Sequence, residues 1–389
     1  MPRRIYLDHA STTPLRPEVL EAMLPFLGEH FGNPSSLHHF GRRPQEALEH
    51  ARGAVAGLIG ARPEEVFFTS GATEANNWAL KGVVQAARVR PAHVITSQIE
   101  HYSVLHAAKT LQRAGARLTL LPVDRFGFVA PQAVAEAIAE DTALISLTHA
   151  SNEIGTIEPI TEIARIARAR KVPLHVDATQ TAGTIPVDVA ALGVDLLTLT
   201  AHQFYGPKGA GALYIRKGTR LLPLLEGGLQ ESGRRAGTEN VAGIVGLGRA
   251  AELAAGELQA RGERLARLRD RLREGLEARV PDLVFTGHPT QRLPGHVSFC
   301  VRYVEGESVL LMLDAKGVCA ASGSSCTSRA LKSSHVLEAI GIEPGLANGS
   351  VMFSLGEGNG EEDVDYVLEV LPPIIERLRA MSPLGRGGE

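Results

Sequence analysis

Short apolar segments rich in β-branched residues alternate with helical segments between about residues 65 and 216. The strand-like segments read VFFT, HVITS, RLTLL, ALISLT, PLHVD, DLLTLT and GALYI. The segments between them carry apolar residues at a period near 3.6, which is typical of helices. This alternation predicts an α/β fold in which helices cover a mainly parallel, seven-stranded sheet. Ligands of such sheets bind at the carboxyl ends of the strands, so we expect a functional site there.

The pattern changes after Gly256, where a long amphipathic helix with an Arg- and Glu-rich outer face is expected. Strands near HVSFCVR and SVMFSLG follow, which predicts a smaller C-terminal α+β domain. We therefore expect an N-terminal arm (1–15) that joins the small domain, a large domain (16–255), the small domain (256–380) and a disordered tail (381–389). The apolar face of the long helix is predicted to carry Leu258, Leu265, Leu268, Leu272 and Leu276.

The composition of the chain argues against several classes of function. The 389 residues carry a net charge of −3 with acidic and basic residues mixed, so no surface for nucleic acid or an anionic membrane is indicated. The sequence holds no long apolar run and no secretory N-terminus, and we expect a cytoplasmic protein. Its three cysteines, Cys300, Cys319 and Cys326, have neither disulfide nor zinc spacing, so at least one is a candidate working thiol.

Polar residues stand where several predicted strands end. Ala72 and Thr73 open a helix in FTSGATEANNWAL, and a helix N-terminus of this kind can bind an anion. His101 follows the strand HVITS, and Asp177 ends the strand PLHVD. Taken one at a time, these residues also have ordinary structural explanations, such as helix capping for Thr73 or an ion pair for Asp177.

The segment TLTAHQFYGPKGAG ends another strand at the same edge, with Thr200 and His202 before a Gly-rich turn. It is neither a Walker loop nor a dinucleotide fingerprint, because the Lys-Ser/Thr pair and the glycine spacing are missing. With these two motifs excluded, the features to be explained are a phosphate pocket, an imidazole and a buried carboxylate. Together they are the groups that hold pyridoxal phosphate, whose protonated ring nitrogen needs a negative partner.

The chain resembles the cysteine desulfurases of the NifS/IscS kind, which are class V aminotransferases with the aspartate-aminotransferase fold (fold type I). The resemblance spans nearly the whole chain. It rests on these stretches: YLDHASTTP, FGNPSSLHHFGR, FTSGATEANNWA, IEHYSVL, NEIGTI, HVDATQTAG, AHQFYGPKGAGALY, RRAGTEN, ASGSSCTS and SSHVLEAIG.

The resemblance implies that His101 stacks on the pyridine ring and that Asp177 pairs with the ring nitrogen. Gln180 and Asn152 would face the 3-oxygen of the cofactor.

The same resemblance implies a phosphate site formed by Ala72, Thr73, Thr200 and His202, with Thr238 contributed by the second subunit of a homodimer.

Cys326 would be the nucleophile that takes sulfur from L-cysteine as a persulfide, for iron–sulfur cluster or thio-cofactor assembly. Its surroundings in ASGSSCTSRALKSS are rich in glycine and serine, which suits a mobile loop. Reactivity would require a lowered thiol pKa.

Gln203 occupies the position at which the family has the lysine that binds the cofactor covalently and shuttles protons. An amide can do neither. Lys208 lies five residues further on and is expected to point elsewhere. Losing a general acid/base lowers a rate roughly 10²- to 10⁴-fold, which is about 3 to 5 kcal/mol of barrier. We therefore expect any pyridoxal phosphate to bind noncovalently.

Further differences from the family affect the substrate side. Met352 stands where an arginine usually binds the substrate carboxylate through two hydrogen bonds, which a thioether cannot form. Glu357 replaces a basic residue, Leu229 and Ser232 replace glycine and arginine, and Ser151 replaces asparagine.

Three functions are compatible with this sequence. The first is a cysteine desulfurase fold that binds the cofactor but is impaired or inactive in cysteine desulfuration. The second is a noncatalytic sulfur carrier, or a partner that docks an iron–sulfur scaffold protein. The third is an enzyme of the same fold with an altered substrate. Retention of His101, Asp177, His202 and Thr238 favours the first over the second. Met352 and Glu357 favour the second or the third over ordinary desulfuration.

Overall fold

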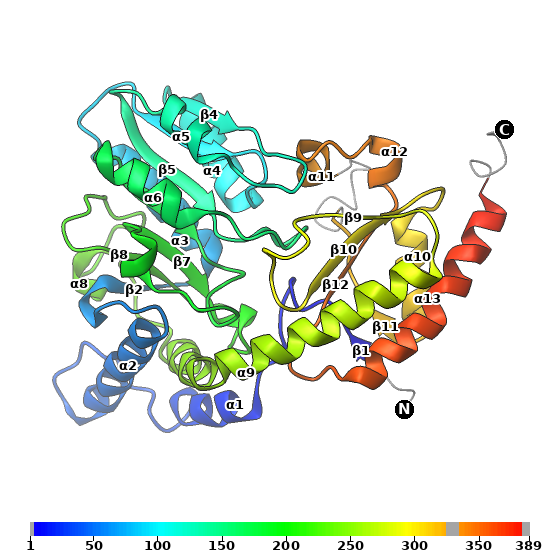
Figure 1. Ribbon diagram of the computed structural model, residues 1–389. Coiled ribbons are helices and arrows are strands. Elements are labelled where there is room, and N and C mark those ends of the chain that lie inside the picture. Colours follow the sequence, from blue (N-terminus) through cyan, green and yellow to red (C-terminus); the bar gives the residue numbers. More distant parts are fainter. Residues whose placement is uncertain (1–3, 324–333, 383–389) are drawn as a thin grey trace.

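The computed structural model describes residues 4–323 and 334–382, which form a larger and a smaller body (Figure 1). The larger body is built on a seven-stranded sheet, as the sequence predicts. Strand β8 is antiparallel to both β2 and β7, and the other neighbours are parallel. In spatial order the strands are β2 (Val66–Thr69), β8 (Gly211–Ile215), β7 (Leu196–Thr200), β6 (Leu174–Asp177), β5 (Thr142–Thr148), β3 (His93–Ser97) and β4 (Arg117–Leu121).

The strands of this sheet are apolar because helices cover both faces. Leu196 belongs to one hydrophobic cluster and the next residue, Leu197, to another, so the two clusters lie on opposite faces of the sheet. Helices α3 (Ala72–Ala86) and α4 (Tyr102–Arg113) cover one face. The other face is covered by α2 (His39–Leu58), α5 (Pro131–Ala137), α6 (Ile160–Ala169), α7 (Val189–Leu192) and the first half of α9 (Val241–Arg279).

The smaller body has its own hydrophobic core under an antiparallel sheet. Its strands are β12 (Ser350–Ser354), β10 (His296–Val301) and β9 (Leu283–Phe285), and its helices include α10 (Gly306–Ala315), α11 (His335–Ala339), α12 (Pro344–Ala347) and α13 (Glu361–Met381). Near the N-terminus, β1 (Ile5–Tyr6) pairs in parallel with β11 (Val318–Cys319). None of the helices in the described part of the chain combines the length and apolar character that crossing a membrane requires.

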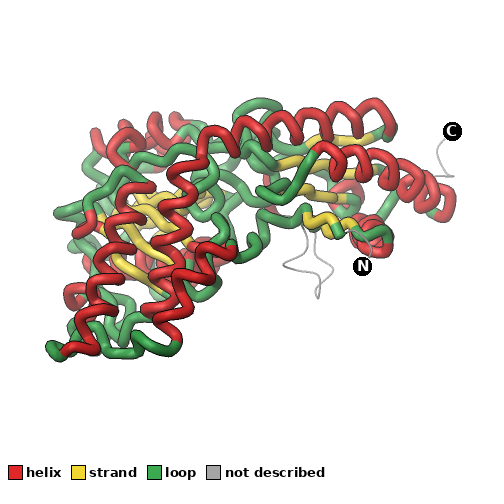
Figure 2. Tube along the Cα trace, turned by 90° about the horizontal axis from the view of Figure 1, so that it is seen from below, coloured by secondary structure: helices red, strands yellow, loops and turns green. Residues whose placement is uncertain are grey.

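Helix α9 (Val241–Arg279) runs from the larger body into the smaller one (Figure 1). Figure 2 shows the strands of the two bodies as separate groups flanked by helices. The sequence pattern places the start of this helix after Gly256, and that prediction is wrong. Glycines in its first turns weaken the helical pattern of the sequence. In the fold they allow close packing. A Cβ at Gly248 would lie 2.6 Å from Ala51 of α2, and one at Gly246 would lie 2.6 Å from Met23 of α1 (Pro17–Met23).

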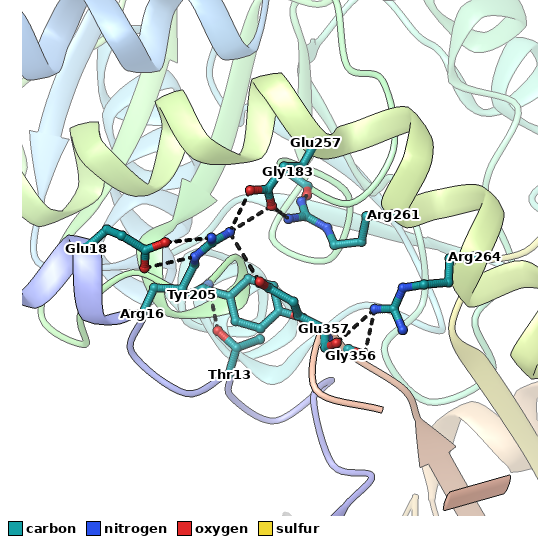
Figure 3. A network of polar contacts seen from close by, with 10 residues as sticks. All are labelled: Thr13, Arg16, Glu18, Gly183, Tyr205, Glu257, Arg261, Arg264, Gly356 and Glu357. Atoms are coloured by element: carbon teal, nitrogen blue, oxygen red, sulfur yellow. Dashed lines mark hydrogen bonds and ion pairs between the residues drawn. The ribbon is translucent and has the colours of Figure 1, made fainter. Parts of the chain in front are cut away.

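Charged side chains join the two bodies near the middle of α9 (Figure 3). Arg16, just before α1, donates to Glu257 of α9 at 2.7 Å and forms an ion pair with Glu357 at 3.3 Å. Glu357 follows β12, and its backbone N–H donates to the hydroxyl of Tyr205 at 2.7 Å. An acidic residue at position 357 therefore has a structural partner in this chain.

Candidate cofactor site

A cavity of about 620 Å³ opens at the carboxyl ends of the parallel strands. The N-terminal segment Ala10–Thr12 forms part of its wall. Thr238 is exposed and does not line it, and Cys326 lies outside the described residues. The cavity brings together these residues singled out in the sequence: Ala72, Thr73, His101, Asn152, Asp177, Gln180, Thr200, His202, Gln203 and Met352.

One end of the cavity is suited to an anion. Strand β2 stops at Thr69, and Gly71 adopts φ 150°, which turns the chain into α3. Within the described residues no side chain caps this helix, so its first N–H groups and positive dipole end face the cavity. Thr200 lies beside this turn, with its hydroxyl 3.7 Å from where a Cβ of Gly71 would stand. His202 adjoins them; its pKa is lowered by burial and by the nearby charge of Lys208.

Asp177 forms the polar floor of the cavity and is 5% exposed. Its carboxylate accepts from the Asn76 side-chain amide at 2.7 Å and from the backbone N–H of Thr179 at 3.0 Å. Both donors are neutral, and no ion pair to Asp177 is found within residues 4–323 and 334–382. Behind it, burial raises the pKa of Glu100 to about 8 against the hydrogen bonds that lower it, and the Asp177 charge contributes in the same direction as burial. Glu100 is therefore largely protonated near neutral pH, and the floor attracts a positive group.

His101 lies at the wall beside Asp177 and begins α4 as its N-cap. The backbone N–H of Ser103 donates to Nδ1 of His101 at 3.1 Å, and the Ser103 hydroxyl lies 2.8 Å from the same nitrogen. Nδ1 is thus a hydrogen-bond acceptor, which leaves the ring proton on Nε2. Hydrogen bonds from Ser103, in the first turn of α4, orient the ring.

Two amides close the cavity against the N-terminal segment. Gln180 and Gln203 each donate to the carbonyl of Ala10 at 3.0 Å, and Gln203 also donates to the carbonyl of Ser11 at 3.2 Å. Gln203 ends the short turn that follows β7. The amide is therefore engaged with the chain itself.

The structure corrects the expectation that Lys208 points elsewhere. Lys208 lines the same cavity as Gln203. The chain turns back after β7 because Tyr205 adopts a left-handed conformation (φ 67°) and because the N–H of Ala201 donates to the carbonyl of Ala210 at 3.0 Å. These contacts return the GPKG segment to the strand edge, which spacing along the chain did not reveal.

Met352, on strand β12 of the smaller body, also lines the cavity and is 5% exposed. Its backbone pairs with Ala321, next to Ser322 and Gly323 of the wall. Glu153 lies near them, and burial raises its pKa to about 7, although a hydrogen bond from Ser334 opposes this.

The sequence did not single out Ser103 or Glu153, which belong to this site or support it, and its interpretation of Asn76 as a possible surface residue is wrong, because Asn76 is 0% exposed. Each lies inside a stretch quoted for the resemblance or directly beside one of the predicted residues. Local spacing carried no signal for Asn76, because its partner Asp177 is 101 residues away.

Comparisons with known proteins find relatives over nearly the whole chain. The model of the family described as aminotransferase class-V matches residues 5–367. A cysteine desulfurase IscS of Dictyoglomus turgidum is 54% identical over 383 residues, which are 98% of this chain and 97% of the relative. A solved NifS-like protein is 38% identical with a TM-score of 0.90, covering 96% of this chain and 100% of the other.

A further solved structure, SspA in complex with cysteine, is 34% identical with a TM-score of 0.80, covering 90% of this chain and 98% of the other. These likenesses confirm the predicted fold class, with its large and mainly parallel sheet. The chain belongs to the class-V aminotransferase family and is a homologue of the cysteine desulfurases of the IscS and NifS kind.

Proposed function

We propose that this protein binds pyridoxal phosphate noncovalently in the cavity and is a cysteine desulfurase homologue with impaired turnover. The observation that carries the proposal is the convergence of the open α3 N-terminus, His101 and Asp177 on one cavity, with Gln203 at its edge. Class-V aminotransferases and cysteine desulfurases depend on this cofactor, which supplies an electron sink when bound.

The residues of the cavity fit the cofactor by their chemistry. Asp177 offers a buried negative charge held only by neutral donors, which matches a protonated ring nitrogen. The hydroxyl of Thr179 is buried without a partner in the described part of the chain and borders the same cavity. Ala72, Thr73 and their helix end would hold the phosphate.

The proposed substrate is L-cysteine, since the relatives are cysteine desulfurases and SspA is solved with cysteine. Cys326 is the proposed sulfur acceptor. Burial raises the pKa of the Cys300 thiol to about 12, and partial burial and Asp314 raise that of Cys319. Because the thiolate is the nucleophile, neither of these cysteines is suited to the task.

Met352 in the cavity wall favours a second candidate, an enzyme of this fold whose substrate lacks the carboxylate that an arginine would bind. The noncatalytic sulfur carrier or scaffold partner remains the third candidate. Sulfide release from L-cysteine by a protein that carries both Gln203→Lys and Met352→Arg separates the first two, because an altered pocket would accept the cofactor and leave cysteine unchanged.

We also propose a cytoplasmic homodimer with the domain limits given by the sequence pattern. Large apolar side chains are exposed near α1 and the start of α2: Leu24, Leu27, Phe31, Leu37 and Phe40 are 54 to 94% exposed. Such a patch on a single chain is typical of a protein interface.

The direct test of cofactor binding is a titration of the purified protein with pyridoxal phosphate, followed by visible absorption. We expect saturable binding that dialysis reverses. Borohydride treatment followed by mass spectrometry should find no cofactor attached to the chain. Failure to bind the cofactor at millimolar concentration would refute the proposal.

A further inference from the structure

Asn76 forms hydrogen bonds to two residues of the cofactor site, Asp177 and Ser103. It lies in the first turns of α3 and is fully buried, at 0% exposure. Its side-chain nitrogen donates to Oδ2 of Asp177 at 2.7 Å and to the hydroxyl oxygen of Ser103 at 2.8 Å. Both N–H groups of the amide are therefore used, and they lead toward different walls of the cavity.

The hydrogen bonds beyond Asn76 follow from its direction of donation. The Ser103 oxygen accepts from Asn76, so the Ser103 O–H is free to donate to Nδ1 of His101 at 2.8 Å. The result is a continuous chain from Asp177 through Asn76 and Ser103 to His101. The carboxylate and the imidazole are oriented by one side chain.

The side-chain oxygen of Asn76 argues against a merely structural role for this residue. Oδ1 of Asn76 is buried and has no hydrogen-bond partner in the described part of the chain. An unpaired buried acceptor destabilises a fold, and an apolar residue of similar size would avoid it. An aspartate would place a second carboxylate against Asp177, whereas leucine would donate to neither neighbour. Asparagine is suited to this place because it supplies two donors at once.

We propose that Asn76 is a positioning residue that aims Asp177 at the ring nitrogen of the cofactor and His101 at the ring face. The inference rests on the proposed binding of pyridoxal phosphate. Other titratable groups near Asp177 are Glu100 behind it, His175 on its own strand and His101 through Ser103. All three remain in every variant below, so their influence is common to each comparison.

The test compares Asn76→Leu with Asn77→Leu, a matched change at the next position of the same helix. The Asn77 side chain donates to the carbonyl of Thr73 and takes no part in the chain of hydrogen bonds. We expect Asn76→Leu to weaken pyridoxal phosphate binding about tenfold, or about 1.4 kcal/mol. We expect Asn77→Leu to stay within about twofold of the unchanged protein.

The pH dependence of cofactor affinity distinguishes the loss of these hydrogen bonds from a packing defect, because a packing defect would not shift it. A donated hydrogen bond stabilises the charged form of a carboxylate, and Asn76→Leu removes one such bond from Asp177. Cofactor affinity should therefore be lost on the acid side at a higher pH in Asn76→Leu than in Asn77→Leu. The circular dichroism of the bound cofactor should also weaken, because His101 is no longer held.

Ser103→Ala is a second variant that breaks only the branch toward His101. It should reduce the circular dichroism of the cofactor and leave the acid-side loss of affinity where it is. A folded Asn76→Leu protein with unchanged affinity and pH profile would overturn the inference. Should Asn76→Leu not fold, an unchanged cofactor spectrum in Ser103→Ala would overturn it, and a changed one would support it.

A measurement without the cofactor separates this inference from the proposed function. The imidazole nitrogens of His101, observed by NMR, should report an accepting Nδ1 in the unchanged protein and a perturbed Nδ1 in Asn76→Leu as well as in Ser103→Ala. If the protein binds no pyridoxal phosphate, the proposed function is wrong, and this spectrum still decides whether the hydrogen bonds from Asn76 reach His101. An identical His101 spectrum in the unchanged protein and in Asn76→Leu would contradict the inference.

Discussion

The amide of Gln203 holds the N-terminal segment against the edge of the cavity. It donates to the carbonyls of Ala10 and Ser11, and Gln180 donates to the first of these as well. A lysine ammonium at position 203 could donate to the same carbonyls. An exchange between amide and amine at this position is therefore compatible with an unchanged fold.

Gln203→Lys should restore a covalent, yellow cofactor complex, because Asp177 and the anion-binding end of the cavity are already in place. Borohydride reduction and mass spectrometry should then find the cofactor on residue 203. Lys208→Ala is the control, since Lys208 lines the same cavity. An adduct on Lys208 in the unchanged protein would contradict the proposal of noncovalent binding.

Gln203→Lys alone should restore little turnover of L-cysteine, because Met352 leaves the substrate carboxylate unpaired. Adding Met352→Arg should raise sulfide release by far more than the two single changes together, as expected of residues that act as a unit. Cys326→Ala is the control that removes the persulfide route. A double variant that binds the cofactor covalently and releases no sulfide would favour the altered substrate.

Glu100 should make the stability of the cofactor-free protein fall as pH rises. Burial raises its pKa from 4.5 to about 8 in the folded state. Between these values the folded protein holds a proton that the unfolded chain has lost, so stability decreases with increasing pH. Glu100→Gln keeps an acceptor for Ser97 and Thr148 without this proton. The variant should raise Tm more at pH 8 than at pH 5; an equal change at both would contradict the argument.

At the scale of elements, α9 and the segment after β12 meet at Arg16. The Arg16 side chain is only 15% exposed and faces the carboxylates of Glu18, Glu257 and Glu357. These hydrogen bonds and charges raise the pKa of Arg16, with Glu18 the largest cause. The guanidinium therefore compensates three carboxylates from separate segments of the chain.

Arg16→Met should destabilise the protein by about 1 to 3 kcal/mol, since it leaves these carboxylates facing one another. Glu357→Gln should cost at most about 1 kcal/mol, as is usual for a partly exposed pair. Chemical unfolding measures both. Arg43→Met is the control, because the Arg43–Glu46 pair is more than 60% exposed on each side and its loss should have little effect. Equal losses for Arg16→Met and Arg43→Met would contradict this account.

At the scale of the whole molecule, the apolar patch near α1 and α2 bears on the proposed homodimer. Phe31 is 71% exposed and stacks on Phe40 at a ring distance of 5.4 Å. Thr238, which the resemblance assigns to the partner's cofactor site, is exposed as well. A second copy over this patch would remove apolar surface from water.

Phe31→Glu should therefore shift the protein toward monomer in sedimentation and weaken pyridoxal phosphate binding at the same time. Leu311→Glu is a matched control, because Leu311 is 73% exposed and lies on the smaller body. An unchanged dimer in Phe31→Glu would place the interface elsewhere. A monomeric unchanged protein at micromolar concentration would contradict the dimer itself.

The larger sheet could be predicted from the sequence because its strands are buried on both faces. Burial on both sides demands continuous apolar runs, and turn residues mark the strand ends where Asp177 and Thr200 stand. The beginning of α9 could not be predicted in this way. Its glycines have low helix propensity, and only contact with Met23 and Ala51 explains why they are helical.

The sequence by itself determined the order of the strands along the chain and which polar residues stand at their carboxyl ends. Only the tertiary structure decided which distant groups meet there. Asn76 contacts Asp177 across 101 residues, and Lys208 returns to the cavity through a backbone turn. Local periodicity reports which side of an element is buried. It holds no information about the neighbour on that side, because long-range contacts arise only when the elements pack.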